Sequence, residues 1–517
     1  MENHNNNENK PEQNQFKKVL ENIPMALTFD DVLMIPQYSD INSRKDCSLI
    51  SRFSRNVKLK IPLVSSPMDT VTETEMAIEM ARNGALGIIH RFQSIEDQTK
   101  MVEKVKRSET HIIRYPICVS KTCKISHVEE LIKLHNIATF LVTNESEISF
   151  SNKSPPRKGS NVGKMTLAGI VTSRDLKFRS SGDQLVEEVM TPLKKLITFN
   201  TENQKPDPVF LKDTMLKNRI EKIPLVGNEG EIQGLVTLKD ISRLFNDTNA
   251  NLDEDGSLIV GAAVGAKDDY IERARSLIDV GCNVLIVDVA NGHSQLCIDA
   301  VKKLKSLFPG VDIVAGSVAS GEGALKLIEA GADGIRCGIG NGSICITRIV
   351  SGAGVPQLSA LLDCAPVCKK YGIPLISDGG NRNSGNMCKA LAAGADCVML
   401  GRLVAGCEES PSKVIYRDGK LCKVYRGMAG YGANVAKAQR IGDQEPSNKT
   451  FTPEGVEGYI PYSGPLKDVL HQFFSGIQSG MSYSGARSIS QLQEKAQFIR
   501  ITSSGKHESG VHDINKI

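Results

Sequence analysis

The chain lacks several features that would assign it to a common class of protein. It contains no run of about 18 apolar residues, so no transmembrane helix is predicted. Its 13 cysteines show neither paired C-x-x-C zinc spacing nor a secreted disulfide framework, and residues 1–15 hold no apolar signal-peptide segment. We therefore expect a cytoplasmic protein with free thiols. The net charge of +4 is too small to indicate a nucleic-acid partner, and no membrane partner is expected.

Short apolar runs recur along the chain, each followed by Gly, Ser, Asp or Asn and then by an amphipathic segment. At 517 residues more than one domain is expected. The strand–helix alternation predicts a parallel β/α architecture, and eight such runs fit a (β/α)8 TIM barrel. An open doubly wound sheet is the alternative, but no G-x-G-x-x-G motif opens a first βα unit. The runs are 61–65, 86–90, 258–262, 283–288, 311–316, 334–338, 374–378 and 397–400.

The segment between the second and third runs contains an internal repeat. Residues 167–176 (LAGIVTSRDL) match residues 232–241 (IQGLVTLKDI) at an offset of 65 residues. The repeat resembles a tandem pair of cystathionine-β-synthase (CBS) domains, a module that often binds adenine or guanine nucleotides such as ATP or GTP. The resemblance implies ribose contacts from Thr172, Asp175, Thr237 and Asp240; the alternative is that these residues only cap helices.

These patterns divide the chain into three predicted parts. The predicted parts are a disordered polar tail at 1–24, a catalytic barrel at 25–109 and 247–517, and an inserted regulatory CBS pair at 110–246.

The glycine-rich run 338–345 (GIGNGSIC) carries the strongest chemical signal. Glycine tolerates positive φ and lets backbone N–H groups turn towards a phosphate. A cysteine in such a loop can act as a covalent nucleophile if its thiolate is stabilised. The alternative is that Cys345 only fills space in the core, as buried cysteines commonly do.

Further motifs occur in a fixed order along the chain. They are 27–33 (LTFDDVL), 66–71 (SPMDTV), 342–345 (GSIC), 377–380 (SDGG), 399–401 (MLG), 425–428 (YRGM) and 453–458 (PEGVEG). By these motifs the chain is identified as a member of the IMP dehydrogenase/GMP reductase family over nearly its whole length past residue 25. The resemblance implies an enzyme that acts on a purine nucleoside monophosphate (GMP, IMP or XMP) with a nicotinamide cofactor.

The resemblance also implies a role for individual residues. Cys345 would attack C2 of the purine, and Thr347 would position a leaving group or water. Asp378 would accept hydrogen bonds from the ribose hydroxyls. The remaining substrate contacts would come from Ser343, Gly380, Gly401 and Tyr425 around the phosphate, with Met428, and from Glu454 at the purine edge. Asp288, Gly338 and Gly340 would face the cofactor. Ser317 stands where the family commonly has Asn, so that role is not carried over.

A monovalent cation, K+, is implied near the same loop. Backbone carbonyls of Gly338, Gly340 and Cys345 would supply oxygen ligands. Glu508, Ser509 and Gly510 of a neighbouring subunit would complete the site. The family resemblance implies a homotetramer, with CBS-mediated octamers as the larger alternative.

The two activities of the family differ in the fate of the cysteine-linked intermediate. The dehydrogenase oxidises IMP with NAD and then hydrolyses the intermediate to XMP, using an Arg-Tyr pair on a flap. The reductase expels ammonia from GMP and then takes hydride from NADPH to give IMP, using a Thr and a flap carboxylate. In this flap, residues 426–451, Arg440 is followed by Ile441, and Asp443 and Glu445 supply carboxylates.

We therefore predict a GMP reductase whose catalytic group includes Arg440, Asp443 and Glu445, because a missing water-activating pair removes a required step of the dehydrogenase. The flap start 429–434 (AGYGAN), with a CBS pair retained, resembles the reductases of trypanosome-type protists. The alternative is an IMP dehydrogenase, since most reductases lack the CBS insert. A nucleotide-sensing scaffold with a weak active site is a third reading.

Overall fold

The computed structural model describes most of the chain. The described residues are 23–108, 112–113, 116–135, 137–145, 165–177, 183–204, 206–246, 249–443 and 452–511. The predicted tail up to residue 22 and the flap residue Glu445 lie outside these ranges. No helix within them is long and apolar enough to cross a membrane.

Eight parallel strands close into a barrel in the order β13-β14-β15-β16-β17-β18-β4-β5. They are β4 (Leu63–Ser65), β5 (Leu86–Ile89), β13 (Val260–Val264), β14 (Val284–Asp288), β15 (Asp312–Val318), β16 (Gly334–Cys337), β17 (Leu375–Asp378) and β18 (Cys397–Leu400). Each strand begins and ends within two residues of a predicted run. The predicted TIM barrel is confirmed.

Alternating residues of the strands fill the barrel interior. Val64, Ile88, Ile286, Val314 and Ile376 belong to one cluster of buried side chains inside the barrel. The residues between them face outwards and join a larger cluster with the surrounding helices. Most of the strands therefore have apolar side chains on both faces, which is why they read as continuous apolar runs.

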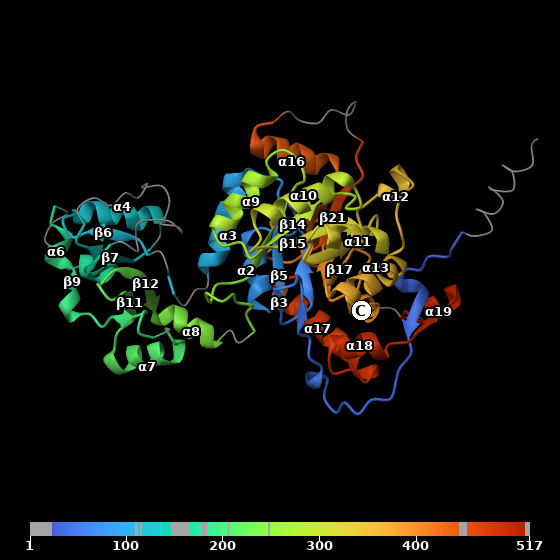
Figure 1. Cartoon of the computed structure of the whole chain (residues 1–517), viewed down its shortest axis with the longest axis horizontal. Coiled ribbons are helices and arrows are strands. Elements are labelled where there is room, and N and C mark those ends of the chain that lie inside the picture. The colour runs from blue at the N-terminus through green and yellow to red at the C-terminus, as the bar shows by residue number, and fades with distance from the viewer. Residues whose placement is uncertain are drawn as a thin grey trace, which may run out of the picture.

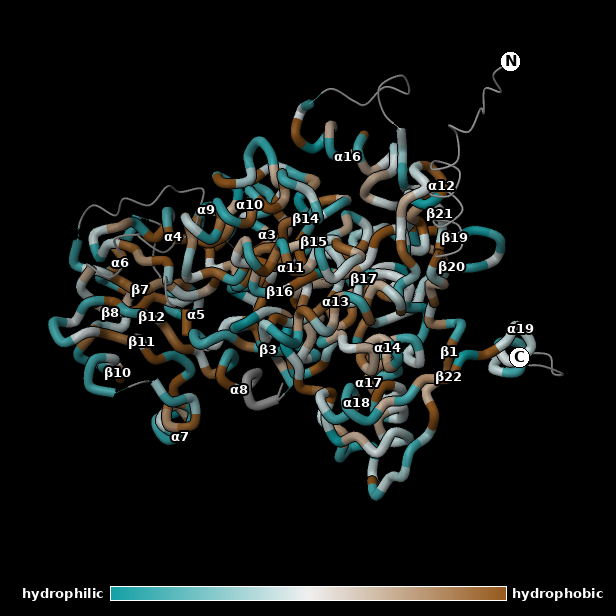
Figure 2. Tube along the Cα trace, turned by 45° about the vertical axis from the view of Figure 1, so that its right-hand side comes forward, coloured by the Kyte–Doolittle hydropathy of each residue, from teal (hydrophilic) through white to brown (hydrophobic). Residues whose placement is uncertain are grey.

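Helices surround the barrel (Figure 1). They include α2 (Thr74–Arg82), α3 (Ile95–Ser108), α9 (Tyr270–Asp279), α10 (Gln295–Leu307), α11 (Gly321–Glu329), α13 (Gln357–Tyr371), α14 (Ser384–Ala392), α17 (Leu466–Tyr483) and α18 (Ile489–Lys495). Several begin at a side-chain cap. Ser294 accepts the N–H of Cys297, Ser320 that of Gly323 and Asn383 that of Asn386. In Figure 2 apolar residues gather in the central strands and polar residues on the outer helices.

A second group of sheets lies beside the barrel in Figure 1. One sheet contains β6 (Cys118–Ser120), β7 (Thr139–Thr143), β8 (Leu167–Thr172) and β9 (Thr191–Pro192), and the other contains β10 (Phe199–Asn200), β11 (Lys222–Val226) and β12 (Ile232–Thr237). The helices of this part include α4 (Ile125–His135), α5 (Ser173–Leu176), α6 (Val186–Val189), α7 (Pro208–Asn218) and α8 (Leu238–Asn246). The repeated sequences form β8 and β12, each antiparallel to the strand before it and each followed directly by a helix. The sequence repeat is thus a structural repeat.

A third sheet and several short elements cover the C-terminal end of the barrel and its flank. The sheet contains β19 (Val414–Arg417), β20 (Lys420–Arg426) and β21 (Glu457–Pro461). Shorter elements are α12 (Thr347–Val350), α15 (Arg402–Ala405), α16 (Tyr431–Ile441), α19 (Ser503–Glu508) and the pair β1 (Val32–Met34) and β22 (Phe498–Arg500). The elements that carry Cys345, Tyr425 and Glu454 therefore converge above the ends of the barrel strands.

Candidate active site

The loop after β16 carries Cys345 across the C-terminal end of the barrel. Its first residue, Gly338, has φ +142°, and a Cβ at this position would lie 2.0 Å from the carbonyl oxygen of Asp378. Gly340 also has positive φ, and a Cβ there would lie 2.6 Å from Cγ of Arg348. Only glycine fits these positions without displacing β17 or Arg348, so the glycines bring the loop close to the end of β17.

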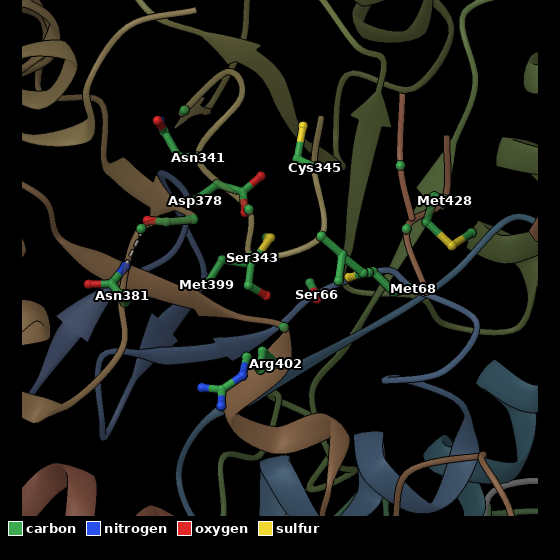
Figure 3. A pocket seen from close by; sticks show the side chains of 18 of the residues that line it. Ser66, Met68, Asn341, Ser343, Cys345, Asp378, Asn381, Met399, Arg402 and Met428 are labelled. Carbon is green, nitrogen blue, oxygen red and sulfur yellow. Dashed lines mark hydrogen bonds between the residues drawn. The ribbon is translucent and has the colours of Figure 1, made fainter. Parts of the chain in front are cut away.

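The Cys345 loop forms one wall of a cavity of about 720 Å³, which is within the size range of small-ligand sites (Figure 3). The cavity brings together these predicted residues: Gly338, Gly340, Ser343, Cys345, Asp378, Gly380, Gly401, Tyr425, Met428 and Glu454. Sequence reasoning assigned no role to other lining residues, among them Ser66, Met68, Asn341, Asn381 and Arg402. Ser66 and Met68 lie in the motif 66–71, and Arg402 directly follows the motif 399–401. Their position in or beside these motifs could have identified them as cavity residues.

A chain of polar contacts joins Cys345 to Glu454 through Thr347. The sulfur of Cys345 lies 3.1 Å from Oγ1 of Thr347. The same hydroxyl donates a hydrogen bond to Oε2 of Glu454 at 2.7 Å. The backbone holds this arrangement, because the Ile346 N–H donates to the Glu454 carbonyl at 2.8 Å and the Val456 N–H donates to the Ile344 carbonyl at 2.9 Å. The thiol of Cys345, the hydroxyl of Thr347 and the carboxylate of Glu454 thus form a continuous row of contacts at one point of the cavity.

Hydroxyl groups gather at the other end of the cavity. The Tyr425 hydroxyl lies close to the Ser343 side chain and to the backbone of Arg402, and burial raises the pKa of Tyr425 to about 12. The phenol is therefore a neutral donor at ordinary pH. Gly401 lies against it, since a Cβ there would be 2.7 Å from the Tyr425 oxygen. The Gly380 N–H donates a hydrogen bond to the Asn341 carbonyl at 3.0 Å. This N–H is therefore occupied within the protein, and the absence of a side chain at Gly380 leaves room in the cavity.

Arg336 of β16 links two carboxylates at the ends of β14 and β17. Its Nη2 donates to Oδ1 of Asp288 at 2.6 Å, and its Nε lies 3.7 Å from Oδ2 of Asp378 without a hydrogen-bond partner. Burial opposes ionisation of Asp288, yet Arg336 and Arg91 hold the pKa of Asp288 below its ordinary value. Burial dominates at Asp378 and raises its pKa despite Arg336. Ser317 Oγ lies 3.5 Å from the Asp378 carboxylate. Asp288 and Arg336 both lie outside the cavity lining, and Arg336 approaches the lining at Asp378.

The flap residues Arg440 and Asp443 do not reach Cys345. Arg440 in α16 pairs with Glu73, with Nη1 and Oε1 3.2 Å apart, and lies 3.4 Å from Nε2 of His90. Burial raises the pKa of Glu73, but His90 and Arg440 outweigh it and leave this pKa below its ordinary value. Asp443 is exposed after the left-handed Gly442, and neither flap residue lines the cavity. Their catalytic roles, and that of Glu445 outside the described residues, stay predictions.

The remaining predicted site residues lie elsewhere. Glu508, Ser509 and Gly510 end α19 and its following turn, away from the cavity lining. In the repeat, the Thr172 hydroxyl donates to the Asp175 carboxylate at 2.7 Å, and the Thr237 hydroxyl donates to that of Asp240. The structure therefore shows these four residues capping helices, and their nucleotide contacts stay a prediction.

Comparison with known proteins places this geometry in a family. A family model described as "IMP dehydrogenase / GMP reductase domain" matches residues 26–512. The chain belongs to this family. It is 46% identical over 507 residues to a GMP reductase of Leishmania major, covering 96% of this chain and 99% of that one. It is 44% identical over 492 residues to an inosine-5′-monophosphate dehydrogenase of Nitrosopumilus maritimus, covering 95% and 98%.

Solved structures of this family have the same fold as this chain. A GMP reductase from Trypanosoma brucei in complex with guanosine 5′-monophosphate superposes with a TM-score of 0.85 at 44% identity, covering 96% of this chain and 100% of that one. The same enzyme in complex with guanosine 5′-triphosphate gives a TM-score of 0.74 at 40% identity, covering 94% and 100%. The predicted family membership of this chain is confirmed.

Proposed function

We propose that this chain is an NADPH-dependent GMP reductase, which converts GMP to IMP and ammonia through an XMP intermediate linked to Cys345. The observation that carries the proposal is the Cys345–Thr347–Glu454 contact chain, because it places a proton-carrying pair beside the nucleophile. The flap offers no Tyr after Arg440 with which to activate water. The similarity to the GMP reductases of Leishmania and Trypanosoma supports the same choice.

The first half of the reaction breaks the C2–N bond of GMP. The Cys345 thiolate attacks C2, and the exocyclic amine leaves as ammonia after it takes a proton. Thr347 lies between the sulfur and Glu454, so it can pass that proton from the carboxyl group to the amine. We propose Glu454 as the carboxyl group for this step, because it accepts the hydrogen bond of the Thr347 hydroxyl.

The second half returns the thiolate. A bound nicotinamide cofactor would supply hydride chemistry at C2, and Cys345 would leave as the thiolate when the C–S bond breaks and IMP is released. The overall balance is GMP, NADPH and two protons giving IMP, ammonium and NADP+. Residues near Asp288 fit such a cofactor, because Arg91 has a buried Nε without a partner and its Nη2 reaches the Asp288 carbonyl only at 3.5 Å. Asp288 and Arg91 would hold the cofactor's polar groups there.

The nucleotide itself is held at two further points. The Ser343 and Tyr425 hydroxyls would donate to the 5′-phosphate. The carboxylate of Asp378, at the end of β17, would accept hydrogen bonds from the ribose hydroxyls. Met428 and Met68 line the cavity and would contact the base.

Regulation and assembly complete the proposal. The segment 110–246 is proposed to be a CBS pair that binds a purine nucleotide such as ATP or GTP, which is consistent with the GTP complex of the Trypanosoma brucei enzyme. We also propose a cytoplasmic homotetramer, in which Glu508, Ser509 and Gly510 of a neighbouring subunit join the carbonyls of Gly338, Gly340 and Cys345 around K+.

An IMP dehydrogenase is the second candidate. The 44% identity to the Nitrosopumilus maritimus dehydrogenase over nearly the full length favours it. It would require another group to activate water, because the described cavity lining contains no Arg-Tyr pair.

The proposal is tested with a Cys345→Ala variant and a matched Cys123→Ala control, which alters a half-buried thiol of the repeat segment. We expect C345A to bind GMP in calorimetry but to oxidise no NADPH, and C123A to keep wild-type turnover. Turnover that survives in C345A would remove the covalent mechanism.

A further inference from the structure

We infer that Asp69 and Arg426 form a positioning pair, which anchors the first residues of the flap to the loop after β4 and so sets the position of Glu454. Neither member of the pair belongs to the described cavity lining, so the pair would act through its neighbours and not by touching substrate. The inference deepens the proposed function, because it rests on the transfer of a proton from Glu454 to the departing amine.

The pair is a forked and largely buried ion pair. Nε of Arg426 donates to Oδ2 of Asp69 at 2.9 Å and lies 3.2 Å from Oδ1, and Nη2 also donates to Oδ2. Only 1% of the Asp69 side chain and 20% of the Arg426 side chain are exposed. Two donors on one carboxylate fix the orientation of the guanidinium as well as its distance. Since removal of one partner leaves a buried charge without compensation, the contact depends on both residues.

Two backbone N–H groups tighten the same contact between the loop after β4 and the flap. The Arg426 N–H donates to Oγ1 of Thr70 at 3.3 Å, and the Asp69 N–H donates to Sδ of Met428 at 3.3 Å. Met68 and Met428 both line the cavity, and Figure 3 shows them on the same side of it. Methionine side chains are flexible, so their positions depend on the backbone that carries them. The ion pair therefore also holds the wall from which both methionines face the cavity.

Backbone hydrogen bonds connect this contact to the Glu454 segment. The Gly427 N–H donates to the Val456 carbonyl at 3.0 Å. The Glu454 N–H donates to the Ala429 carbonyl, also at 3.0 Å. On its other side the same segment is hydrogen-bonded to the Cys345 loop. Four segments are thus joined one after another, with the ion pair at one end of the row: 68–70, 426–429, 454–456 and 344–346.

A second ion pair of the flap lies too far along the chain to replace the first. Arg440 pairs with Glu73 near the C-terminal end of α16, with Nη1 and Oε1 3.2 Å apart. This contact secures the helix, whereas residues 426–429 precede the helix. Loss of the first pair therefore releases the row of segments at the end nearest the loop after β4. A shift of about 1 Å in a reacting group is enough to lower a rate by about 100-fold.

The experiment measures ammonia release from GMP in single turnover with excess full-length enzyme, for wild type, Asp69→Asn, Arg426→Gln and Arg426→Lys. The rate constant should fall by about 10- to 100-fold in D69N and in R426Q, because the proton donor is displaced from the reacting atoms. R426K keeps the charge without the fork and should recover part of the loss. A merely structural role would lower the amplitude and the melting temperature but leave the rate constant of the folded molecules unchanged.

Asp253→Asn is the matched control. Asp253 pairs with Lys106, and 18% of the Asp253 side chain is exposed, but this pair lies before β13, at the opposite end of the barrel strands from the cavity. D253N also breaks a largely buried ion pair, so its melting temperature should fall. Its rate constant should stay within about threefold of wild type, because no group near the reacting atoms moves.

Two outcomes would overturn the inference. A rate constant in D69N and R426Q within about threefold of wild type would show that the pair serves stability alone. An equal loss in D253N would show a general loss of packing. Failure of the proposed function looks different, because wild type would then release no ammonia from GMP. Calorimetry with GMP still tests the pair in that case: D69N should weaken binding and D253N should not, and unchanged affinity in D69N would overturn the inference.

Discussion

Thr347 donates a hydrogen bond to Glu454 at 2.7 Å, across 107 residues of sequence, while its hydroxyl lies 3.1 Å from the sulfur of Cys345. The contact unites the loop after β16 with the segment before β21. Backbone hydrogen bonds order both sides of this contact, and in the proposed mechanism it would carry a proton to the departing amine.

Glu454→Gln should slow deamination. The amide keeps an acceptor for the Thr347 hydroxyl but cannot deliver a proton, so the rate of ammonia release from GMP in single turnover should fall by about 100-fold. Asp443→Asn is the matched control, because Asp443 is an exposed flap carboxylate outside the cavity lining. A larger loss in D443N than in E454Q would return the acid role to the flap.

Arg336 should position Asp378 and Asp288 together. Arg336→Met leaves two carboxylates without their shared cation, and we expect a loss of about 3–5 kcal/mol in the free energy of unfolding. Arg336→Lys keeps the charge but loses the forked geometry. R336K should therefore fold, while KM rises for both GMP and the cofactor with a smaller change in kcat. If R336K raises neither KM, Arg336 serves stability alone.

Asp396 should make stability depend on pH. Its carboxylate accepts the Leu375 N–H at 2.8 Å, and burial raises its pKa from 3.8 to about 6. The folded state thus holds the proton up to about pH 6, whereas the unfolded chain releases it near pH 4. Stability conferred by this proton falls as pH rises from about 4 to 6 and stays lower above that range.

Asp396→Asn keeps an acceptor for Leu375 and removes the cost of a buried charge. Urea unfolding at pH 8 should show a gain of about 1–3 kcal/mol relative to wild type, and the gain should shrink at pH 4. The exposed Asp418→Asn serves as the control. A gain of the same size at both pH values would rule out titration of Asp396 as its cause.

Gly338→Ala should be poorly tolerated. The new Cβ would lie 2.0 Å from the Asp378 carbonyl oxygen, at φ +142°. Displacement of β17 should cost about 3 kcal/mol or more and disturb both Asp378 and the Cys345 loop. Gly310→Ala is the matched control, because a Cβ there meets no atom within 4 Å. Thermal melting of the two variants measures the difference, and equal melting temperatures would contradict the close approach.

The barrel was predictable because each of its strands is buried on both faces and reads as an apolar run. Ser343, Cys345 and Asp378 were predictable because they sit in contiguous motifs at the ends of such runs, where barrel sites form. The link between Thr347 and Glu454 was not, since the nearer flap carboxylates Asp443 and Glu445 were equally plausible partners along the chain.

Other parts of the site depend on contacts between distant strands and loops, which the sequence pattern does not reveal. Arg336 lies inside an apolar strand, and only the closed barrel brings Asp288 and Asp378 to its two sides. The Gly380 N–H was predicted to face a phosphate but is occupied by the Asn341 carbonyl, a contact set by the path of the loop.

The central claim is tested most directly by absorbance at the nicotinamide band with the purified full chain. One reaction contains GMP and NADPH, and the other contains IMP and NAD. The account predicts loss of NADPH with formation of IMP and ammonia in the first reaction and no change in the second. Formation of NADH and XMP in the second reaction, with NADPH untouched in the first, would contradict it.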